Sequence, residues 1–323
     1  MPMTNYPQGF AHGLSLRGMP LLQTHPGEVF WVSNPTVLMT GQAAGSDGNP
    51  GTFQRPFATI AGALNHCLAN RGDIVFVKPG HAETLTAATS LLFDVAGVAI
   101  IGLGTGSKRP TLTYTTANTA TIGLESANMS IQNSLFVGNF AAIAAAMTVT
   151  ATGTPTDFCV ENCEFRDTAT NKGFQVVVKC GAYANALDGL QFLGNRIISL
   201  QTAAAATNAV SVGAAQARLI INDNYVNSTA SSTGPALLAA GANVVSNIQI
   251  ARNRVYKPTT AATGILMATS TTATGLVHDN YAFTLATGSG LAVTASTGLG
   301  FAQNFVTITG AAEKSAIINP VYA

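Results

Sequence analysis

Charged residues are scarce in this sequence, and that scarcity argues against several kinds of partner. Only 9% of the 323 residues are Asp, Glu, Lys or Arg, and the formal net charge is +1. A nucleic-acid-binding protein needs a basic patch or stripe, whereas the Lys and Arg residues of this chain are spread along its length. We therefore expect no nucleic-acid partner. The low charge does not indicate disorder, because 47% of the residues are hydrophobic.

Long hydrophobic runs are missing as well. No apolar stretch approaches the length that crosses a bilayer. Residues 1–10 lack the charged and then apolar order of a signal peptide. We therefore expect no membrane partner and no export through a signal sequence.

Cysteine is sparse, and the four cysteines do not form a metal-binding pattern. None lies in a CxxC pair, and no pair of histidines at ligand spacing completes a site with Cys159 and Cys163. We interpret Cys67, Cys159, Cys163 and Cys180 as small buried thiols, which fits assembly in a reducing cytosol. No metal and no other cofactor is expected.

A repeat of about 29 residues fills most of the chain. Its first copies, residues 94–100, 125–131 and 154–160, place a turn former before two apolar residues that are separated by one position. Such alternation predicts a short strand that begins after a turn. The last apolar position, which we call the anchor, recurs at Ile100, Ile131, Val160, Phe192, Ile221, Ile250, Val277 and Phe301.

Each repeat contains two further short strands. One is expected between anchors, at residues 122–124, 147–149, 176–178, 210–212, 265–267 and 291–293, and another about five residues after most anchors. No helices separate these strands, which excludes a βαβ fold, and the LxxLxL signature of leucine-rich repeats is missing. Short strands that stack in register, coil on coil, predict an all-β parallel β-helix with one continuous core.

Asparagine recurs three residues after each of the last five anchors. Successive coils lie about 4.8 Å apart, so these side chains should stack at one bend, where Asn tolerates left-handed backbone and each amide can bind the next. We interpret the column as a structural ladder rather than a polar binding groove. Its members are Asn195, Asn224, Asn253, Asn280 and Asn304.

Two further columns flank the asparagines. Asp223, Arg252 and Asp279 precede ladder members and form a stack of alternating charge. Arginine and aromatic residues follow the ladder members, so that Arg side chains can lie on aromatic faces. We interpret both columns as outward-facing packing. The second column consists of Arg196, Tyr225, Arg254, Tyr281 and Phe305.

The N-terminal part of the sequence has a different character. Residues 1–52 are rich in Pro and Gly, which predicts an extended arm and linker that bind a partner through small apolar side chains. Arg55–Leu68 has apolar residues at helical spacing, which predicts a helix that caps the solenoid. The helix and the coils are expected over residues 53–310, followed by a tail at 311–323. The predicted partner-binding residues of the arm are Tyr6, Phe10, Leu14, Leu21 and Leu22.

Two sets of segments carry a family resemblance. Pro56–Ile60 and Gly72–Gly80 resemble the beginning of pectin-lyase-like right-handed β-helix domains. Residues 5–10, 25–33 and 98–104 resemble a family of tailed-phage β-helix proteins. The resemblance implies a right-handed solenoid in a virion that is assembled in the host cytoplasm. It does not fix which part of the virion holds the protein.

No catalytic pattern is visible among the 14 acidic residues. Glycoside cleavage needs paired carboxylates about 5–9.5 Å apart, or a base with a metal. Glu161, Glu164 and Asp167 form the one tight group, while Asp223 and Asp279 lie two coils apart with Arg252 between them. We therefore predict that the chain is not an enzyme, and that catalytic residues are absent.

The main hypothesis is a phage capsid decoration or cement protein. It would be a homotrimer, bind the major capsid protein or other virion proteins, and stabilise the head. The alternative is a tail fibre or tailspike adhesin that binds host glycans, or a β-helix polysaccharide lyase or hydrolase. The single tryptophan, Trp31, and an aromatic fraction of 7% argue modestly against sugar stacking.

Overall fold

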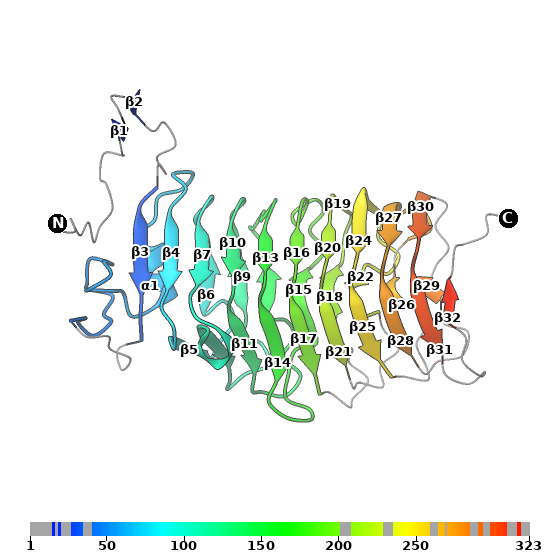
Figure 1. The fold of residues 1–323 in the computed structure, drawn as a ribbon, viewed down its shortest axis with the longest axis horizontal. Coiled ribbons are helices and arrows are strands. Elements are labelled where there is room, and N and C mark those ends of the chain that lie inside the picture. Colours follow the sequence, from blue (N-terminus) through cyan, green and yellow to red (C-terminus); the bar gives the residue numbers. More distant parts are fainter. Residues whose placement is uncertain are drawn as a thin grey trace.

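The structure is a computed structural model of the 323-residue chain. It describes residues 15–16, 19–20, 27–34, 41–200, 208–228, 235–258, 264–268, 270–284, 290–292, 298–308 and 315–317. These residues form an elongated right-handed parallel β-helix (Figure 1), which confirms the predicted fold. None of the helices in these ranges is long and apolar enough to span a bilayer.

Three parallel sheets run along the axis of the solenoid, and each coil adds one strand to each sheet where the coil is complete. In Figure 1 the strands of sheet 1 occupy the upper half of the molecule and those of sheet 2 the lower half. Sheet 1 consists of β3 (Val29–Val32), β4 (Ile74–Val77), β7 (Ala99–Gly102), β10 (Ser130–Gln132), β13 (Cys159–Glu161), β16 (Gln191–Leu193), β20 (Ile220–Asn222), β24 (Ile248–Ala251), β27 (Thr274–His278) and β30 (Gly298–Ala302).

Sheets 2 and 3 complete the coils. Sheet 2 consists of β5 (Ala82–Leu85), β8 (Thr111–Tyr114), β11 (Leu135–Gly138), β14 (Glu164–Asp167), β17 (Arg196–Ser199), β21 (Tyr225–Ser228), β25 (Arg254–Lys257), β28 (Tyr281–Thr284), β31 (Phe305–Ile308) and the antiparallel β32 (Ser315–Ile317). Sheet 3 consists of β6 (Leu91–Phe93), β9 (Ile122–Leu124), β12 (Met147–Val149), β15 (Val176–Cys180), β18 (Asn208–Val212), β22 (Leu238–Ala239), β26 (Gly264–Ala268) and β29 (Gly290–Ala292).

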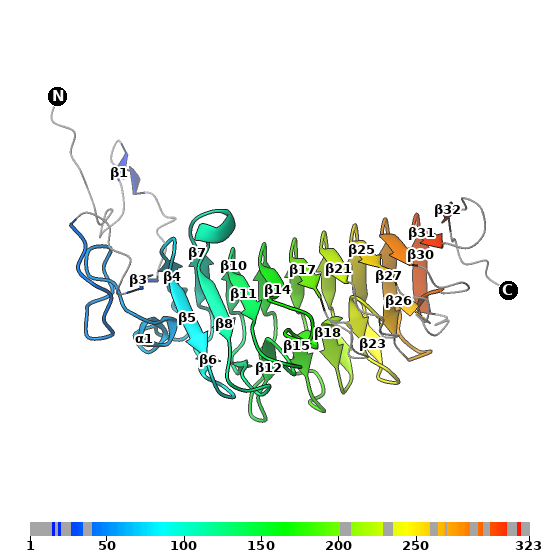
Figure 2. The ribbon, with the colours of Figure 1, turned by 90° about the horizontal axis from the view of Figure 1, so that it is seen from below.

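Smaller elements lie outside these sheets. The strands β1 (Ser15–Leu16) and β2 (Met19–Pro20) pair antiparallel, and β19 (Gln216–Ala217) pairs parallel with β23 (Val245–Ser246). The helix α1 (Ile60–Leu64) lies near the N-terminal end of the solenoid, and β32 lies near the other end (Figure 2). A short 3-10 helix, η1 (Gly106–Lys108), follows β7.

The strand register confirms the repeat that the sequence predicts. Each anchor pairs with the next in sheet 1, from Ile100 with Ile131 through to Val277 with Phe301. The anchors alternate with outward side chains, and seven of the eight are buried while Phe301 is half-buried. Inside the solenoid the rings of Phe136 and Phe165 stack at 4.5 Å between centroids. The core is thus continuous from coil to coil.

The expected boundary of the arm at residue 52 is wrong, because β3 belongs to sheet 1. Its Phe30 and Val32 are buried, and Phe30 pairs with Val75 of β4. The side-chain alternation of a single strand is a weak signal when its partner lies 45 residues further along the chain. The expected tail at 311–323 is also partly wrong, since β32 pairs with β31. The predicted arm residues Tyr6, Phe10, Leu14, Leu21 and Leu22 lie outside the described residues.

The predicted capping helix exists but is shorter than Arg55–Leu68. It begins after Thr59, whose hydroxyl accepts a hydrogen bond from the Gly62 amide at 2.9 Å and so caps the first turn. Phe57 cannot join the helix, because its amide donates to the Trp31 carbonyl and its carbonyl accepts from the Ser33 amide. The segment before Thr59 therefore runs along the edge of β3 instead of turning.

Candidate functional site

Aromatic and arginine side chains alternate along the outer face of sheet 2. Arg196, Tyr225, Arg254, Tyr281 and Phe305 occupy the same position on five successive strands, β17, β21, β25, β28 and β31. Tyr225 is 38% exposed and Tyr281 is 53% exposed. We call this row and the neighbouring Tyr256 and Phe283 the aromatic–arginine face.

Ring contacts hold the aromatic side chains of this face in place. Tyr281 stacks on Phe305 at 5.1 Å, and Tyr256 stacks on Phe283 at 4.9 Å, both nearly parallel. The Arg196 guanidinium lies 5.7 Å from the Tyr225 ring centroid. Such contacts fix the ring planes, and the side of each ring that faces solvent remains available to a ligand.

Two adjoining grooves follow this face, and both are lined by Tyr225, Arg254 and Tyr281. The first lies at the bend between sheets 1 and 2, and its lining contains polar and charged groups. The second lies over the strands and is largely aromatic. The first groove is lined by Asp223, Asn224, Tyr225, Arg252, Arg254, Asp279 and Tyr281. The second is lined by Tyr225, Arg254, Val255, Tyr256, Tyr281, Ala282, Phe283 and Phe305.

The asparagine column aligns the side chains of both grooves. The amide N–H of Asn224 donates to Oδ1 of Asn253 at 2.9 Å, and that of Asn253 donates to Oδ1 of Asn280 at 3.0 Å. The Asn253 side-chain amide also donates to the Ile221 carbonyl of the preceding coil at 2.8 Å. Each asparagine therefore connects neighbouring coils at the bend. Asn195 and Asn304 lie at the ends of the same column.

The backbone conformation at the bend explains why the flanking residues project outward. Asp223, Arg252 and Asp279 have φ angles of 61°, 55° and 53°, in the left-handed region. This turn buries the asparagine that follows and begins the next strand with an outward side chain. One bend geometry, repeated on successive coils, thus places the charged row and the aromatic–arginine row side by side.

One ion pair, between Arg252 and Asp223, neutralises two of the four charged side chains that line the first groove. The Arg252 guanidinium binds both Asp223 carboxylate oxygens, at 2.7 and 2.6 Å, and this contact raises the pKa of Arg252. Asp279 binds the Nδ1 atom of His278 at 2.7 Å. Arg254 is different, because no carboxylate within the described ranges forms an ion pair with it. The Arg254 guanidinium is therefore a cation without an ion-pair partner in these ranges, on the strand between those of Tyr225 and Tyr281.

A second group of charges lies on the same sheet, toward the middle of the solenoid. Glu164 of β14 receives Arg109 at 2.7 Å, Arg166 at 3.7 Å and Arg196 at 4.0 Å. Three guanidinium groups around one carboxylate leave a local excess of positive charge. Because Arg196 also contacts Tyr225, this cluster adjoins the aromatic–arginine face.

The acidic group that the sequence suggests does not assemble into a carboxylate pair. Glu164 lies in the arginine cluster, whereas Asp167 is buried and accepts hydrogen bonds from the Leu200 amide and the Ser199 hydroxyl, at 2.9 and 3.0 Å. Burial raises the pKa of Asp167 to about 6. Glu161 belongs to β13 in sheet 1. These three carboxylates therefore have different environments.

The cysteines are free, and burial raises the pKa of each thiol. The pKa is about 12 for Cys67 and Cys163 and about 11 for Cys159 and Cys180, so all four are protonated at neutral pH. Cys159 differs from the prediction, since it is half-buried on the outer side of β13. Among the described residues, no group of three His, Cys, Asp or Glu side chains is arranged to hold a metal ion.

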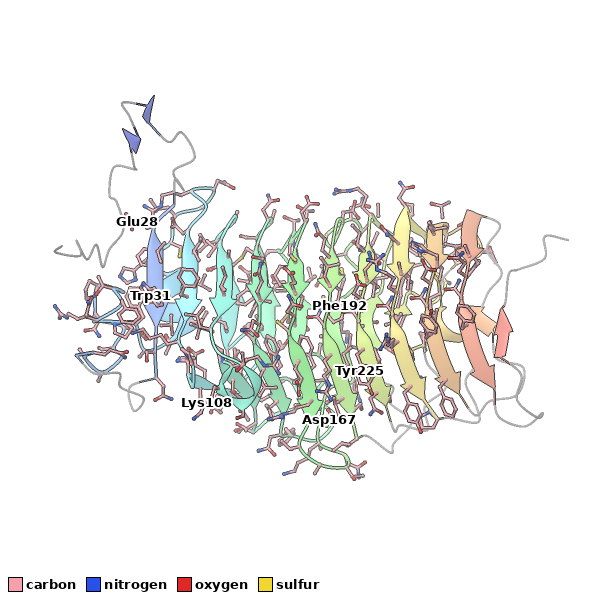
Figure 3. The ribbon with its side chains drawn as sticks, in the orientation of Figure 1. Glu28, Trp31, Lys108, Asp167, Phe192 and Tyr225 are labelled. Carbon is pink, nitrogen blue, oxygen red and sulfur yellow. The ribbon has the colours of Figure 1, made fainter. Side chains whose placement is uncertain are left out.

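Sequence reasoning found the row of five residues in the aromatic–arginine face but interpreted it as packing, and it missed Tyr256 and Phe283. The aromatic fraction of the whole chain suggested too few rings for sugar stacking, yet the coils gather several of them on one face. Trp31 lies far from this face, at the N-terminal end, while Tyr225 lies on sheet 2 (Figure 3). The column of residues that follow the asparagines was the signal that could have identified the site.

Comparisons with known proteins find two polysaccharide lyases of related architecture. A rhamnogalacturonan lyase is matched over 90% of this chain and 90% of its own, with a TM-score of 0.39 and 12% identity. A pectate lyase, Pel9A, is matched over 89% of this chain and 78% of its own, again with a TM-score of 0.39 and 12% identity. No family model and no curated protein matches the chain.

These comparisons correct the prediction that the chain is not an enzyme. The finding that overturns this prediction is that both matching structures are lyases. At this level of similarity the likeness assigns neither an activity nor a substrate to the chain. In its fold the chain is an all-β right-handed parallel β-helix.

Proposed function

We propose that the protein binds an extended glycan along the aromatic–arginine face, as a tail-fibre or tailspike adhesin does. The observation that carries this proposal is the row Tyr225, Arg254 and Tyr281, which lines both grooves and has two exposed rings. Tyrosine rings offer apolar faces to the C–H groups of a sugar, and the neighbouring polar groups can bind its hydroxyls. The proposal rests on this surface and not on the likeness to lyases.

The spacing of the rings suits a polymer more than a single sugar. Successive strands lie about 4.8 Å apart, so Tyr225 and Tyr281 are separated by about 10 Å along the solenoid axis. A ligand that contacts both rings must therefore run across the strands, over Arg254. The polar bend of the first groove then lies along one side of the bound chain.

Glycan-array binding with purified variants tests this proposal. We expect Tyr225→Ala and Tyr281→Ala each to weaken binding by about fivefold, the value of one aromatic contact of about 1 kcal/mol. Tyr183→Ala is the matched control, because Tyr183 is 36% exposed but lines neither groove. Equal affinities for all three variants, or no glycan bound by the unaltered protein, would reject the proposal.

Cleavage is measured on the same ligands. Release of new reducing ends, together with ultraviolet absorbance from an unsaturated uronate, would indicate a lyase. Reducing ends without that absorbance would indicate a hydrolase. Either activity should fall together with binding in the Tyr225 and Tyr281 variants if the face described above is where the reaction occurs.

The place of the protein in a phage particle stays a prediction that the sequence resemblance implies. We propose a homotrimer on the tail, because an exposed ring surface serves capture of a host glycan directly. Immuno-electron microscopy of particles tests this location. Label on the head shell would favour a capsid decoration protein that binds the major capsid protein.

A further inference from the structure

We propose that the glycan bound by this face is a polyanion, whose negative groups are held by arginines in line with the rings. This inference rests on the proposed function and adds the chemical class of the ligand. Its first support is the concentration of cations on one face of a chain that has few charges. Of the nine arginines in the sequence, Arg166, Arg196 and Arg254 project from sheet 2, and Arg109 reaches its outer face through Glu164.

The carboxylates near this face do not balance those cations. Glu164 is the one acidic residue at an outward position of sheet 2 among the described residues, and three arginines already surround it. Asp223 is bound by both arms of Arg252, and Asp279 by His278. The five arginines Arg109, Arg166, Arg196, Arg252 and Arg254 outnumber the carboxylates Glu164, Asp223 and Asp279, so the net charge that meets a ligand is positive.

The geometry of the row matches a linear polymer with repeated anionic groups. Arg196 and Arg254 are two strands apart, about 10 Å along the axis, and Tyr225 lies between them. A sugar ring stacked on Tyr225 would place substituents on both sides within reach of a guanidinium. Guanidinium groups bind carboxylate, sulfate and phosphate oxygens in pairs, so any of these substituents on the sugar meets the requirement.

A neutral glycan would not supply a partner for the arginines of this row. Arg254 has no carboxylate partner in the described part of the chain, and a neutral ligand that covers it would remove water without supplying a countercharge. An anionic ligand supplies that charge and gains a charge-assisted hydrogen bond. We therefore expect binding of the preferred ligand to weaken as salt concentration rises, since the face is open to solvent.

The test uses pairs of polymers that differ only in charge. Polygalacturonate, alginate and polysialic acid are each compared with the same polymer after its carboxyl groups have been reduced to alcohols. We expect at least one acidic polymer to bind about tenfold more tightly than its neutral partner, the value of one charge-assisted hydrogen bond. Arg254→Gln should lose that preference, so that the acidic polymer and its neutral partner bind this variant with equal affinity.

The control and the contrary outcomes separate the two proposals. Arg55→Gln is the matched control, because Arg55 is exposed in the N-terminal loop far from sheet 2. Equal affinity for acidic and neutral partners, with Arg254→Gln without effect, overturns the polyanion and leaves glycan binding standing. No binding of any polymer overturns both proposals. Tighter binding of a single-stranded oligonucleotide than of any acidic glycan overturns the ligand class assigned here.

Discussion

At the scale of single residues, one buried side chain type organises the bend that carries the site. Each asparagine of the column accepts a hydrogen bond from the coil that precedes it and donates one to a carbonyl there, as Asn253 does with Asn224 and Ile221. Asparagine suits this position because it has both a donor and an acceptor on a short side chain. The sequence alone identified this column, since the residue type recurs at a constant offset from the anchors.

Removal of one amide from the middle of the column should cost more than removal at its end. Asn253→Ala removes the acceptor of the Asn224 backbone amide and the side-chain donor to the Ile221 carbonyl, so we expect a loss of about 1–3 kcal/mol in the free energy of unfolding. Asn304→Ala, at the last described member, should cost less. Urea denaturation measures both values, and equal small losses would contradict a cooperative column.

Asp167 should make stability depend on pH in an unusual direction. Its pKa is raised from 3.8 to about 6 by burial, so the folded protein binds more protons than the unfolded chain between these values. The free energy of unfolding therefore falls as pH rises from about 4 to 6, and the full effect is about 3 kcal/mol. The stabilisation by protonated Asp167 is fully present below about pH 4 and is lost above about pH 6.

The variant Asp167→Asn isolates this effect from the other carboxylates. Asparagine has no charge to bury, so the difference in unfolding free energy between the variant and the unaltered protein should change across this pH range. Urea titrations at pH 4, 5, 6 and 7 provide the comparison. A difference that is constant with pH would show that Asp167 titrates normally.

At the scale of elements, the loop before α1 closes the end of the solenoid. We call residues 41–58 the end strap. Its Gly51 and Phe57 supply backbone partners to β3, and the Val32–Phe57 bridge is parallel like the pairs within sheet 1. An open strand edge invites pairing with another chain, and the strap removes that edge. The first coil is therefore complete without a partner.

The limits of sequence prediction are clearest at this end. The coils after residue 94 repeat at a nearly constant interval, so their strands and register follow from pattern alone. β3 is separated from β4 by the end strap and α1, an insertion that breaks the interval. The helix start also depends on a tertiary contact, the pairing of Phe57 with Trp31, which no local propensity encodes. Periodicity predicts what repeats, and these features occur once.

Lys78 should hold the end strap on the solenoid. Its buried ammonium binds Oε1 of Gln42 at 2.6 Å and the Phe53 carbonyl, and it lies 3.7 Å from the Phe53 ring centroid. Lys78→Met removes these bonds, so we expect the amide of Trp31, which donates to Gly51, to exchange with solvent about tenfold faster. Native-state hydrogen exchange measures this rate.

The exposed Lys179 on β15 provides the control for this substitution. Lys179→Met should leave exchange at Trp31 unchanged, and the amide of Ile131 inside sheet 1 should be unaffected in both variants.

Burial lowers the pKa of Lys78 to about 8, so the contribution of Lys78 to stability grows as pH rises from 8 toward 10.5. The protection of the Trp31 amide in the unaltered protein, measured relative to the exchange rate of an unstructured peptide at the same pH, should therefore rise over that range. Equal protection of the Trp31 amide in the Lys78→Met and Lys179→Met variants would mean that the backbone hydrogen bonds alone hold the end strap on β3.

At the scale of the whole molecule, stacking turns a dispersed sequence into a continuous face. Arg166 and Arg196 are 30 residues apart in the chain, and Arg196 and Arg254 are 58 residues apart, a spacing that suggested no basic stripe. The register of β14, β17, β21 and β25 brings them to the same outer face of sheet 2, where Tyr225 separates Arg196 from Arg254. Composition therefore describes a solenoid poorly, because residues one repeat apart are neighbours in space.

Truncation of the N-terminus should separate folding from attachment. Because β3 begins at Val29 and the Glu28 amide binds Asp73, a deletion of residues 1–26 leaves every described sheet 1 contact in place. We expect this variant to keep its β-sheet circular dichroism, melting temperature and glycan affinity, since the aromatic–arginine face lies toward the other end (Figure 3). We expect it to lose binding to particles or homotrimer formation, because the arm is predicted to hold the partner-binding residues.

A deletion of residues 1–32 is the contrasting variant, since it also removes β3. Phe30 and Val32 are buried against the next coil, and burial of two such side chains contributes about 3–6 kcal/mol. This variant should therefore melt at a lower temperature, while the shorter deletion does not. If the deletion of residues 1–26 also lowers the melting temperature, the arm belongs to the fold. If it still binds particles and assembles normally, attachment occurs through the coils, and the face of sheet 2 becomes the first surface to examine.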